Sequence, residues 1–236
     1  MGVISSALLK WYQSAVWAQG NAHGGAIDTA AAITSGAMNN VFPNVTNAQR
    51  IAGLTDYRKV WFRNENADDY TTVKGWIQAN TPATNDAVWI VLAGSKSTTS
   101  TPVQLTQATM AFTAASTAVT GIGTSFLTEL AVGEEVFNGT DDTEAASVRI
   151  ASIESDTALT LSSAYGGTTN ATARGYVAGA DQCTFVQPDA IDHADALVLG
   201  SLAQNGSRGI WVKRVVDAGG LDGYDNNSFT LRVEDS

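Results

Sequence analysis

The chain has very few of the residues that hold small domains together through disulfides or metals. Its 236 residues include one cysteine, Cys183, and two histidines, His23 and His193. A single cysteine excludes an intrachain disulfide, and two distant histidines without cysteines at ligand spacing argue against a zinc site. A chain of this length typically removes about 70% of its unfolded surface from water, so it can bury a core without such links. We therefore expect no metal site and no cofactor.

Basic residues and long apolar runs are also scarce. Lys and Arg number 13 against 23 Asp and Glu, which gives a formal net charge of −10. Such an excess of negative charge repels phosphate backbones and anionic bilayers. No stretch approaches the roughly 20 apolar residues of a membrane-spanning helix, and the first residues lack the basic start of a secretory signal. We expect neither nucleic acid nor a membrane as a partner.

Catalytic patterns are missing or have simpler interpretations. His193 lies between two aspartates, which fits a metal cluster or a catalytic dyad but is more typical of a solvated acidic turn. The acids Glu134 and Glu135, like Asp141 and Asp142, are neighbours in sequence and would point to opposite faces of a regular strand. Neither pair then forms the two-carboxylate site of a glycosidase, and solvated loop charge is the better interpretation. We expect no enzymatic activity and no catalytic residue.

The clearest positive signal is an alternation of residue types in short runs bounded by turn residues, which predicts β-strands. In Tyr57 to Asn64 the odd-numbered residues share one face and the even-numbered residues the other. His23-Gly24-Gly25 predicts a Gly-rich surface loop, and helical patterns are scarce. Further strands are expected at Thr72 to Ala79, Ala87 to Ala93, Cys183 to Val186, Ala196 to Leu199, Gly209 to Val216 and Ser228 to Val233.

The middle third of the chain differs in composition. After the Ser/Thr-rich stretch Gly94 to Pro102, residues 103–178 contain two basic and eight acidic residues, against 11 and 15 in the rest of the chain. Strands are expected within it at Ala108 to Phe112, Ala118 to Thr120, Val132 to Phe137, Ala146 to Ile153, Ala158 to Leu161 and Thr172 to Ala178.

These patterns predict an all-β fold in two domains. Residues 1–102 and 179–236 would form a discontinuous β-sandwich from the two ends of the chain. Residues 103–178 would form a second, acidic domain, a small β-barrel or sandwich, inserted into one of its loops. Insertion at an exposed loop disturbs the host domain little.

Aromatic residues near the N-terminus suggest a contact segment. Trp11, Tyr12 and Trp17 lie in Ser6 to Ala18, a stretch too isolated to fold alone and hydrophobic enough to need cover. We predict that residues 1–20 form an assembly arm that adds to a sheet edge of this sandwich or of a neighbouring subunit. Trp11, Tyr12 and Trp17 are the candidate subunit-contact residues, and deletion of the arm should weaken assembly more than folding.

Several strings of the outer segments follow one another in a distinctive order. They are Leu9 to Ser14 (LKWYQS), Gly20 to Ile27 (GNAHGGAI), Asn39 to Thr46 (NNVFPNVT), Ala52 to Lys59 (AGLTDYRK), Val73 to Pro82 and Ile210 to Ala218. This order resembles virion structural proteins of tailed bacteriophages, in which a KYYLSGG-like strand, an LGG loop, an NNLFD-V turn and a G-T-YR strand follow one another. Val41 and Pro43 depart from the turn of that pattern, so nothing is transferred to it.

The middle segment carries a second resemblance. Val119 to Leu127, Glu129 to Glu134 and Ile150 to Leu161 are similar to a small β-module that recurs in phage tail and fibre proteins. Together the resemblances imply a non-enzymatic structural subunit of a virion, in the tail or baseplate, that contacts other copies of itself and neighbouring virion proteins. A host-glycan or receptor-binding module displayed on the virion, or a head or collar decoration protein, are the alternatives.

Overall fold

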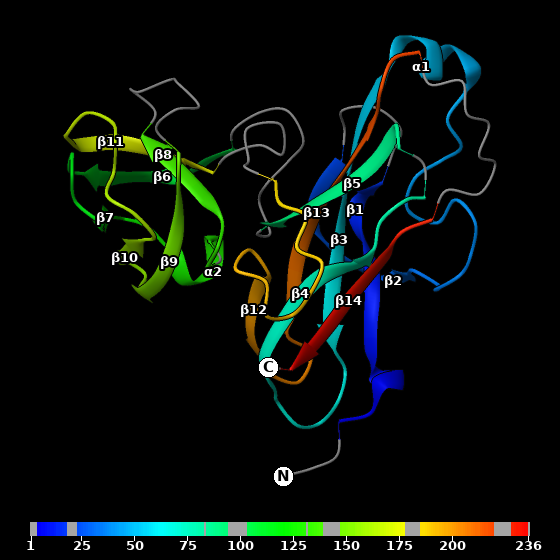
Figure 1. Cartoon of the computed structure of the whole chain (residues 1–236). Coiled ribbons are helices and arrows are strands. Elements are labelled where there is room, and N and C mark those ends of the chain that lie inside the picture. Colours follow the sequence, from blue (N-terminus) through cyan, green and yellow to red (C-terminus); the bar gives the residue numbers. More distant parts are fainter. Residues whose placement is uncertain are drawn as a thin grey trace. The chain divides into compact units, whose positions relative to one another are not determined.

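The structure is a computed structural model, and it describes residues 4–17, 23–82, 84–93, 103–130, 132–138, 147–177, 185–219 and 228–235. It confirms the all-β fold class (Figure 1). In the described ranges the helices are short: the 3-10 turn η1 (Ser6–Leu8), α1 (Asn47–Ala52) and α2 (Phe126–Glu129). The predicted linker Gly94 to Pro102, Cys183 and the pair Asp141 and Asp142 lie outside the described residues.

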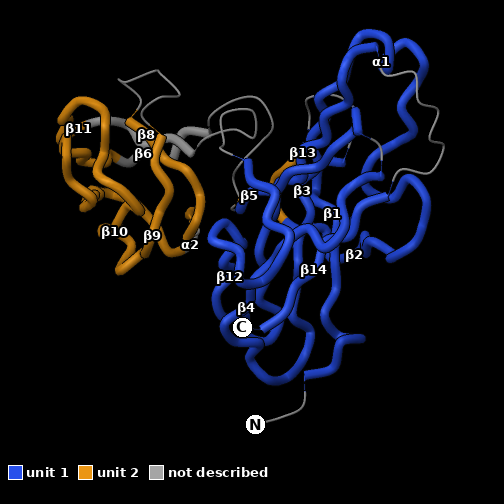
Figure 2. The backbone as a smooth tube through the Cα atoms, in the orientation of Figure 1, with its two compact units in different colours: residues 1–23, 27–92, 184–236 blue, residues 24–26, 93–183 orange. Residues whose placement is uncertain are grey.

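The chain divides into two compact units, which Figure 2 colours separately. Unit 1 comprises Met1–His23, Ile27–Leu92 and Thr184–Ser236, and unit 2 comprises Gly24–Ala26 and Ala93–Cys183. Unit 1 is thus built from both ends of the chain. The predicted domain boundaries, after residues 102 and 178, adjoin stretches outside the described residues and stay predictions.

Unit 1 is a β-sandwich of two antiparallel sheets. The larger sheet has the order β2 (His23–Ala32), β1 (Leu9–Trp17), β3 (Leu54–Asn64), β13 (Ser207–Val216) and β5 (Asp86–Ala93). The smaller sheet has the order β12 (Leu197–Leu202), β4 (Tyr70–Ala79) and β14 (Thr230–Asp235).

Alternating residues of these strands build the core between the two sheets. Val60 and Phe62 of β3 and Val212 of β13 are buried there with residues of the smaller sheet such as Val73 and Leu199. The even-numbered residues of β3 therefore face the core, as the alternation predicts. Burying each such side chain contributes about 1.5–3 kcal/mol, which makes this face the main stabilising element of the sandwich.

Unit 2 contains a closed barrel. Its strand order is β10 (Ala158–Leu161), β7 (Ala118–Ile122), β6 (Val103–Phe112), β11 (Asn170–Val177), β8 (Glu135–Asn138) and β9 (Val148–Ser155), with β9 returning to β10. The rings of Phe112 and Tyr165 pack at 4.8 Å in its core. Because every strand has two neighbours, the barrel has no free edge.

The two N-terminal predictions have different outcomes. Of the two alternatives for Ser6 to Ala18, the structure has pairing within this sandwich, because β1 pairs with β3 through Leu9↔Asn64 to Gln13↔Val60. A contact with a neighbouring subunit stays a prediction, whereas the second N-terminal prediction is wrong. His23-Gly24-Gly25 is not a surface loop, because β2 begins at His23, which is buried. Gly24 and Gly25 have φ angles of 112° and 79°, which glycine adopts easily, so the strand can form despite its glycines.

The acidic pair of unit 2 is also placed differently from the prediction. Glu134 and Glu135 are buried rather than solvated loop charges. The register of β8 and β9 sets Glu135 opposite Arg149, and Glu135 Oε1 lies 3.4 Å from Arg149 Nε. The Ser147 hydroxyl donates to Glu135 Oε2 at 3.0 Å. A buried carboxylate is stable when such partners offset its lost hydration.

Candidate subunit interface

The three candidate contact residues lie on one strand but not on one surface. Trp11 and Trp17 pack against the sandwich core, and the Trp11 and Phe62 ring centroids are 5.2 Å apart. Tyr12 is 4% exposed and lies on the other face of β1. β1 therefore uses these side chains largely within its own chain, and their role as subunit contacts stays a prediction.

Tyr12 belongs to a polar cluster that ties β1 to the end of β3. Its hydroxyl donates to the Glu65 carboxylate, and Lys10 Nζ lies 2.6 Å from Glu65 Oε2. The hydrogen bonds from Lys10 and Tyr12 lower the pKa of Glu65. The same bond to Glu65, together with burial, raises the pKa of Tyr12. This cluster holds β1 in register, and the side chains of Lys10, Tyr12 and Glu65 are all engaged within it.

The outer face of the larger sheet carries stacked lysines and aromatic rings. Lys59 is 0% exposed, and its Nζ lies 4.9 Å from the Trp61 ring centroid and 5.6 Å from that of Trp211. Lys213 Nζ lies 5.9 Å from the Trp89 centroid and 5.5 Å from that of Phe185. Each contact of this kind contributes about 0.5–2 kcal/mol, so the face is stabilised by cation–π packing.

One side of the sandwich, formed by the edge strands β5 and β12 and by residues 186–188, has its backbone groups bonded; we call it the closed side. Asn80 Nδ2 donates to Val88 O at 3.0 Å, and Val88 N donates to Asn80 Oδ1 at 2.9 Å. The next outward residue of β5, Ile90, exchanges backbone bonds of 2.9 and 3.0 Å with Val186. The edge of β5 is thereby occupied by its own chain.

The closed side continues onto the smaller sheet. Ile77 of β4 donates its N–H to Pro188 O at 2.8 Å, so residues 186–188 join the two sheets. On β12, Arg208 Nε donates to Leu199 O at 3.0 Å, and the pairing with β4 shifts register around Gly200, whose φ is 74°. Side-chain caps and bulges of this kind protect sheet edges from further pairing.

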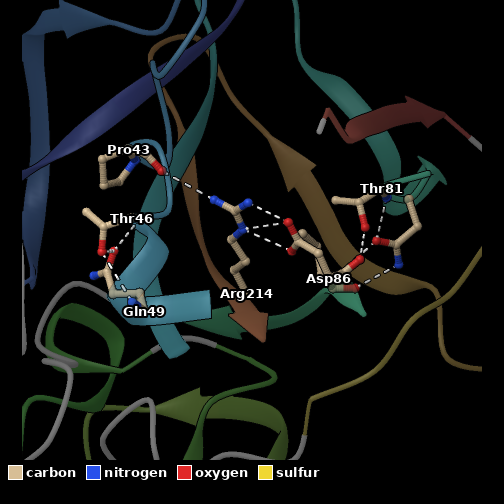
Figure 3. A network of polar contacts seen from close by, with 8 residues as sticks. Pro43, Thr46, Gln49, Thr81, Asp86 and Arg214 are labelled. Atoms are coloured by element: carbon tan, nitrogen blue, oxygen red, sulfur yellow. Dashed lines mark hydrogen bonds and ion pairs between the residues drawn. The ribbon is translucent and has the colours of Figure 1, made fainter. Parts of the chain in front are cut away.

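A buried ion pair anchors this side, as Figure 3 shows. Arg214 of β13 binds the carboxylate of Asp86 on β5, with Nε donating to Oδ1 at 2.9 Å and Nη2 lying 2.5 Å from Oδ2. The two side chains are 12% and 3% exposed. Arg214 Nη1 also donates to Pro43 O at 3.3 Å, and the Thr81 hydroxyl donates to Asp86 O. A paired guanidinium and carboxylate with these extra bonds fix β5 against β13.

The other side of the smaller sheet ends in β14, which we call the open edge. Since Ile77 N–H points toward Pro188 and away from β14, its partner Leu231 directs its own N–H and C=O away from β4. The backbone groups of Val233 point the same way as those of Leu231, whereas the backbone N–H and C=O groups of Arg232 and Glu234 point toward β4. Within the part of the chain that the structure describes, the outward backbone groups of Leu231 and Val233 have no partner.

The remaining candidates show no assembled chemistry. His193 is exposed, and its Nδ1 accepts the N–H of Asp195 at 3.2 Å, as in a turn. In the described ranges no three His, Cys, Asp or Glu side chains gather as a metal site would require. Nor is any helix of those ranges long and apolar enough to cross a bilayer. No protein-family model, curated protein or solved structure matches the chain.

The sequence reasoning missed the residues that distinguish the two sides. Asn80 and Arg214 act on partners that only the folded topology brings near, so no local pattern marks them. The strand Ser228 to Val233 was predicted, and its opposite charges at positions 232 and 234 were visible in the sequence. That this strand lies at a sheet edge follows from the pairing alone.

Proposed function

We propose that the chain is a non-enzymatic structural subunit of a tailed-bacteriophage virion, in the tail or baseplate, that works through contacts with neighbouring subunits. The open edge of β14 is the observation that carries this proposal, because unpaired strand groups are a template for a strand from another chain. The resemblance of the outer segments to phage virion proteins indicates which assembly the subunit belongs to, and we place the chain in the virion.

The contrast between the two sides of the sandwich supports an assembly role. The closed side is capped by Asn80, Val186 and Arg208, so the fold protects an edge where pairing would be unwanted. Val233 of β14 has no such cap in the described residues. An edge left open beside protected ones is typical of a surface that a partner covers.

Mass spectrometry of purified virions of the encoding phage, with immunogold electron microscopy to locate the chain, tests the proposal. We expect the chain in stoichiometric amounts on the tail or baseplate. Its absence from particles would overturn the proposal, and a position on the head or collar would favour a decoration protein instead.

The partly exposed cluster on the outer face favours a second candidate, a host-glycan-binding module. Trp89, Phe185 and Tyr57 are partly exposed, and the Tyr57 and Phe185 ring centroids are 5.8 Å apart. Sugar rings stack on such aromatic faces. Glycan-array binding by the full chain that a Trp89→Ala substitution abolishes would support this candidate, and no binding to any host-surface glycan would exclude it.

A further inference from the structure

The two faces of β14 carry different side chains. Leu231 and Val233 pack against the sandwich core yet remain partly exposed at the edge. Arg232 and Glu234 point to the opposite face, where their side chains are 46% and 39% exposed and form an ion pair. The edge therefore offers Leu231 and Val233, followed by the exposed Asp235, on one face, one positive and one negative charge on the other, and outward backbone groups between them.

We infer that β14 pairs with β14 of a second copy of this chain, antiparallel, about a two-fold axis at Val233. This inference names the partner of the subunit contact on which the proposed function rests. In that arrangement Val233 lies opposite Val233 of the second copy, and Leu231 lies opposite Asp235. These are the residues whose backbone groups point outward, so the two Val233 residues can exchange both hydrogen bonds across the axis, and the Leu231 N–H can donate to the Asp235 carbonyl.

The charges of β14 select this register. With the axis at Val233, Arg232 of each copy lies opposite Glu234 of the other, in a pair without direct backbone bonds, where side chains approach most closely. An axis at Arg232 would set two arginines opposite each other, and an axis at Glu234 would set two glutamates opposite each other. Like charges in these positions are destabilising, and an axis at Leu231 would set Arg232 opposite Thr230 without any charge pair, so only the central register sets opposite charges against each other.

Pairing in this way also gives the outward backbone groups hydrogen-bond partners and covers exposed apolar surface. The N–H groups of Leu231 and Val233 gain carbonyl acceptors, while the backbone of Asp235 already hydrogen bonds to Tyr70. The exposed part of Val233 is covered by Val233 of the second copy, and Leu231 has that Val233 as its diagonal neighbour. The result is a continuous sheet in the order β12, β4, β14, β14, β4, β12, with an isologous two-fold interface.

Cysteine cross-linking tests the register. In a Cys183→Ser background, one chain carries Arg232→Cys and a second, mass-tagged chain carries Glu234→Cys. Since opposite residues in such a pair lie within disulfide reach, we expect cross-linked dimers when the two chains are mixed and oxidised, and essentially none from either chain alone. Dimers from one chain alone would show a different axis, and no cross-link in the mixture would overturn the proposal.

Charge exchange tests the complementarity without new bonds. Analytical ultracentrifugation of the full chain should show a monomer–dimer equilibrium, with Arg232→Glu raising the Kd about tenfold or more and Glu234→Arg doing the same. Circular dichroism checks that both variants stay folded. The double exchange Arg232→Glu with Glu234→Arg should restore the Kd to within about threefold of the original. A monomeric full chain at all concentrations, or a double exchange as weak as the singles, would overturn the proposal.

The two proposals fail separately. A chain that is monomeric in solution and does not cross-link, yet is present in virions, would refute the β14 pairing and leave the structural role in place. A dimer with the predicted register whose chain is absent from virions would refute the structural role and leave the pairing in place.

Discussion

The two sides of the sandwich differ in what happens to the outward backbone groups of their edge strands. On the closed side, Val88 and Ile90 of β5 have their outward backbone groups bonded to Asn80 and Val186. At the open edge, Leu231 and Val233 of β14 have outward groups without a partner in the described residues. The barrel of unit 2 avoids the problem by closing on itself. An edge is therefore a feature that this chain blocks in one place and retains in another.

The largest expected effect comes from removing β1. Deletion of residues 1–20 takes out the strand that lies between β2 and β3, so we expect the sandwich to lose its cooperative fold. Urea unfolding followed by circular dichroism measures this. A truncated chain that stays folded and fails only to assemble would instead support the assembly arm predicted from the sequence, and would leave the larger sheet tolerant of losing two strands.

The next largest effect on stability is expected when the Arg214–Asp86 ion pair of the closed side is broken. Arg214→Ala leaves the Asp86 carboxylate, which is 3% exposed, without its guanidinium, and we expect a loss of about 3–5 kcal/mol in the free energy of unfolding. Arg232→Ala on the open edge is the matched control, because its exposed pair should contribute about 1 kcal/mol or less. Similar losses for the two variants, measured in monomeric protein, would contradict the difference between the sides.

Uncapping the closed side should both destabilise the chain and make a new edge. Asn80→Ala removes the acceptor of the Val88 N–H, and we expect a loss of about 1–3 kcal/mol in the free energy of unfolding. Light scattering should also show more self-association, because β5 becomes available for pairing. Asn80→Asp retains the acceptor and is the control. A variant that loses stability without new association would show that residues 186–188 alone block the edge.

The smallest effect concerns acid. The pKa of Glu65 lies below its ordinary value of 4.5 in the folded chain, so its contribution to stability is complete above that pH and is lost as the pH falls through the folded pKa. Glu65→Gln should lower stability at neutral pH by about 1 kcal/mol and weaken the fall in stability below pH 4.5. Urea midpoints between pH 7 and about pH 3 measure this. An unchanged pH profile would remove Glu65 from the attachment of β1.

The sequence predicted the strands whose alternation is local. The run from Tyr57 to Asn64 sets Val60 and Phe62 toward the core and Lys59 and Trp61 toward the other face, as the structure has them. The alternation in the sequence as a whole was also sufficient to predict the all-β fold class. β2 was missed because its first residues, His23-Gly24-Gly25, resemble a Gly-rich loop, although glycine adopts the positive φ angles found there within a strand.

What the sequence did not predict depends on contacts between distant residues. The burial of Glu135 follows from its cross-strand partner Arg149, which is not visible in a run of neighbouring acids. Likewise, Gln187 donates to Val88 O at 2.9 Å although 99 positions separate the two residues. Local patterns identify strands, whereas the state of an edge depends on the order in which strands pair.

The distribution of tryptophan has a practical consequence. All six tryptophans lie in the ranges of unit 1, and residues 93–183 contain none. Intrinsic emission excited at long wavelength therefore senses the sandwich alone, with the fully buried Trp211 as a probe next to Lys59. A chemical-denaturation curve from emission and one from a global probe would coincide if the units melt together and separate if they melt independently. The tryptophan emission of the unmodified chain can therefore show whether the two units unfold together or separately.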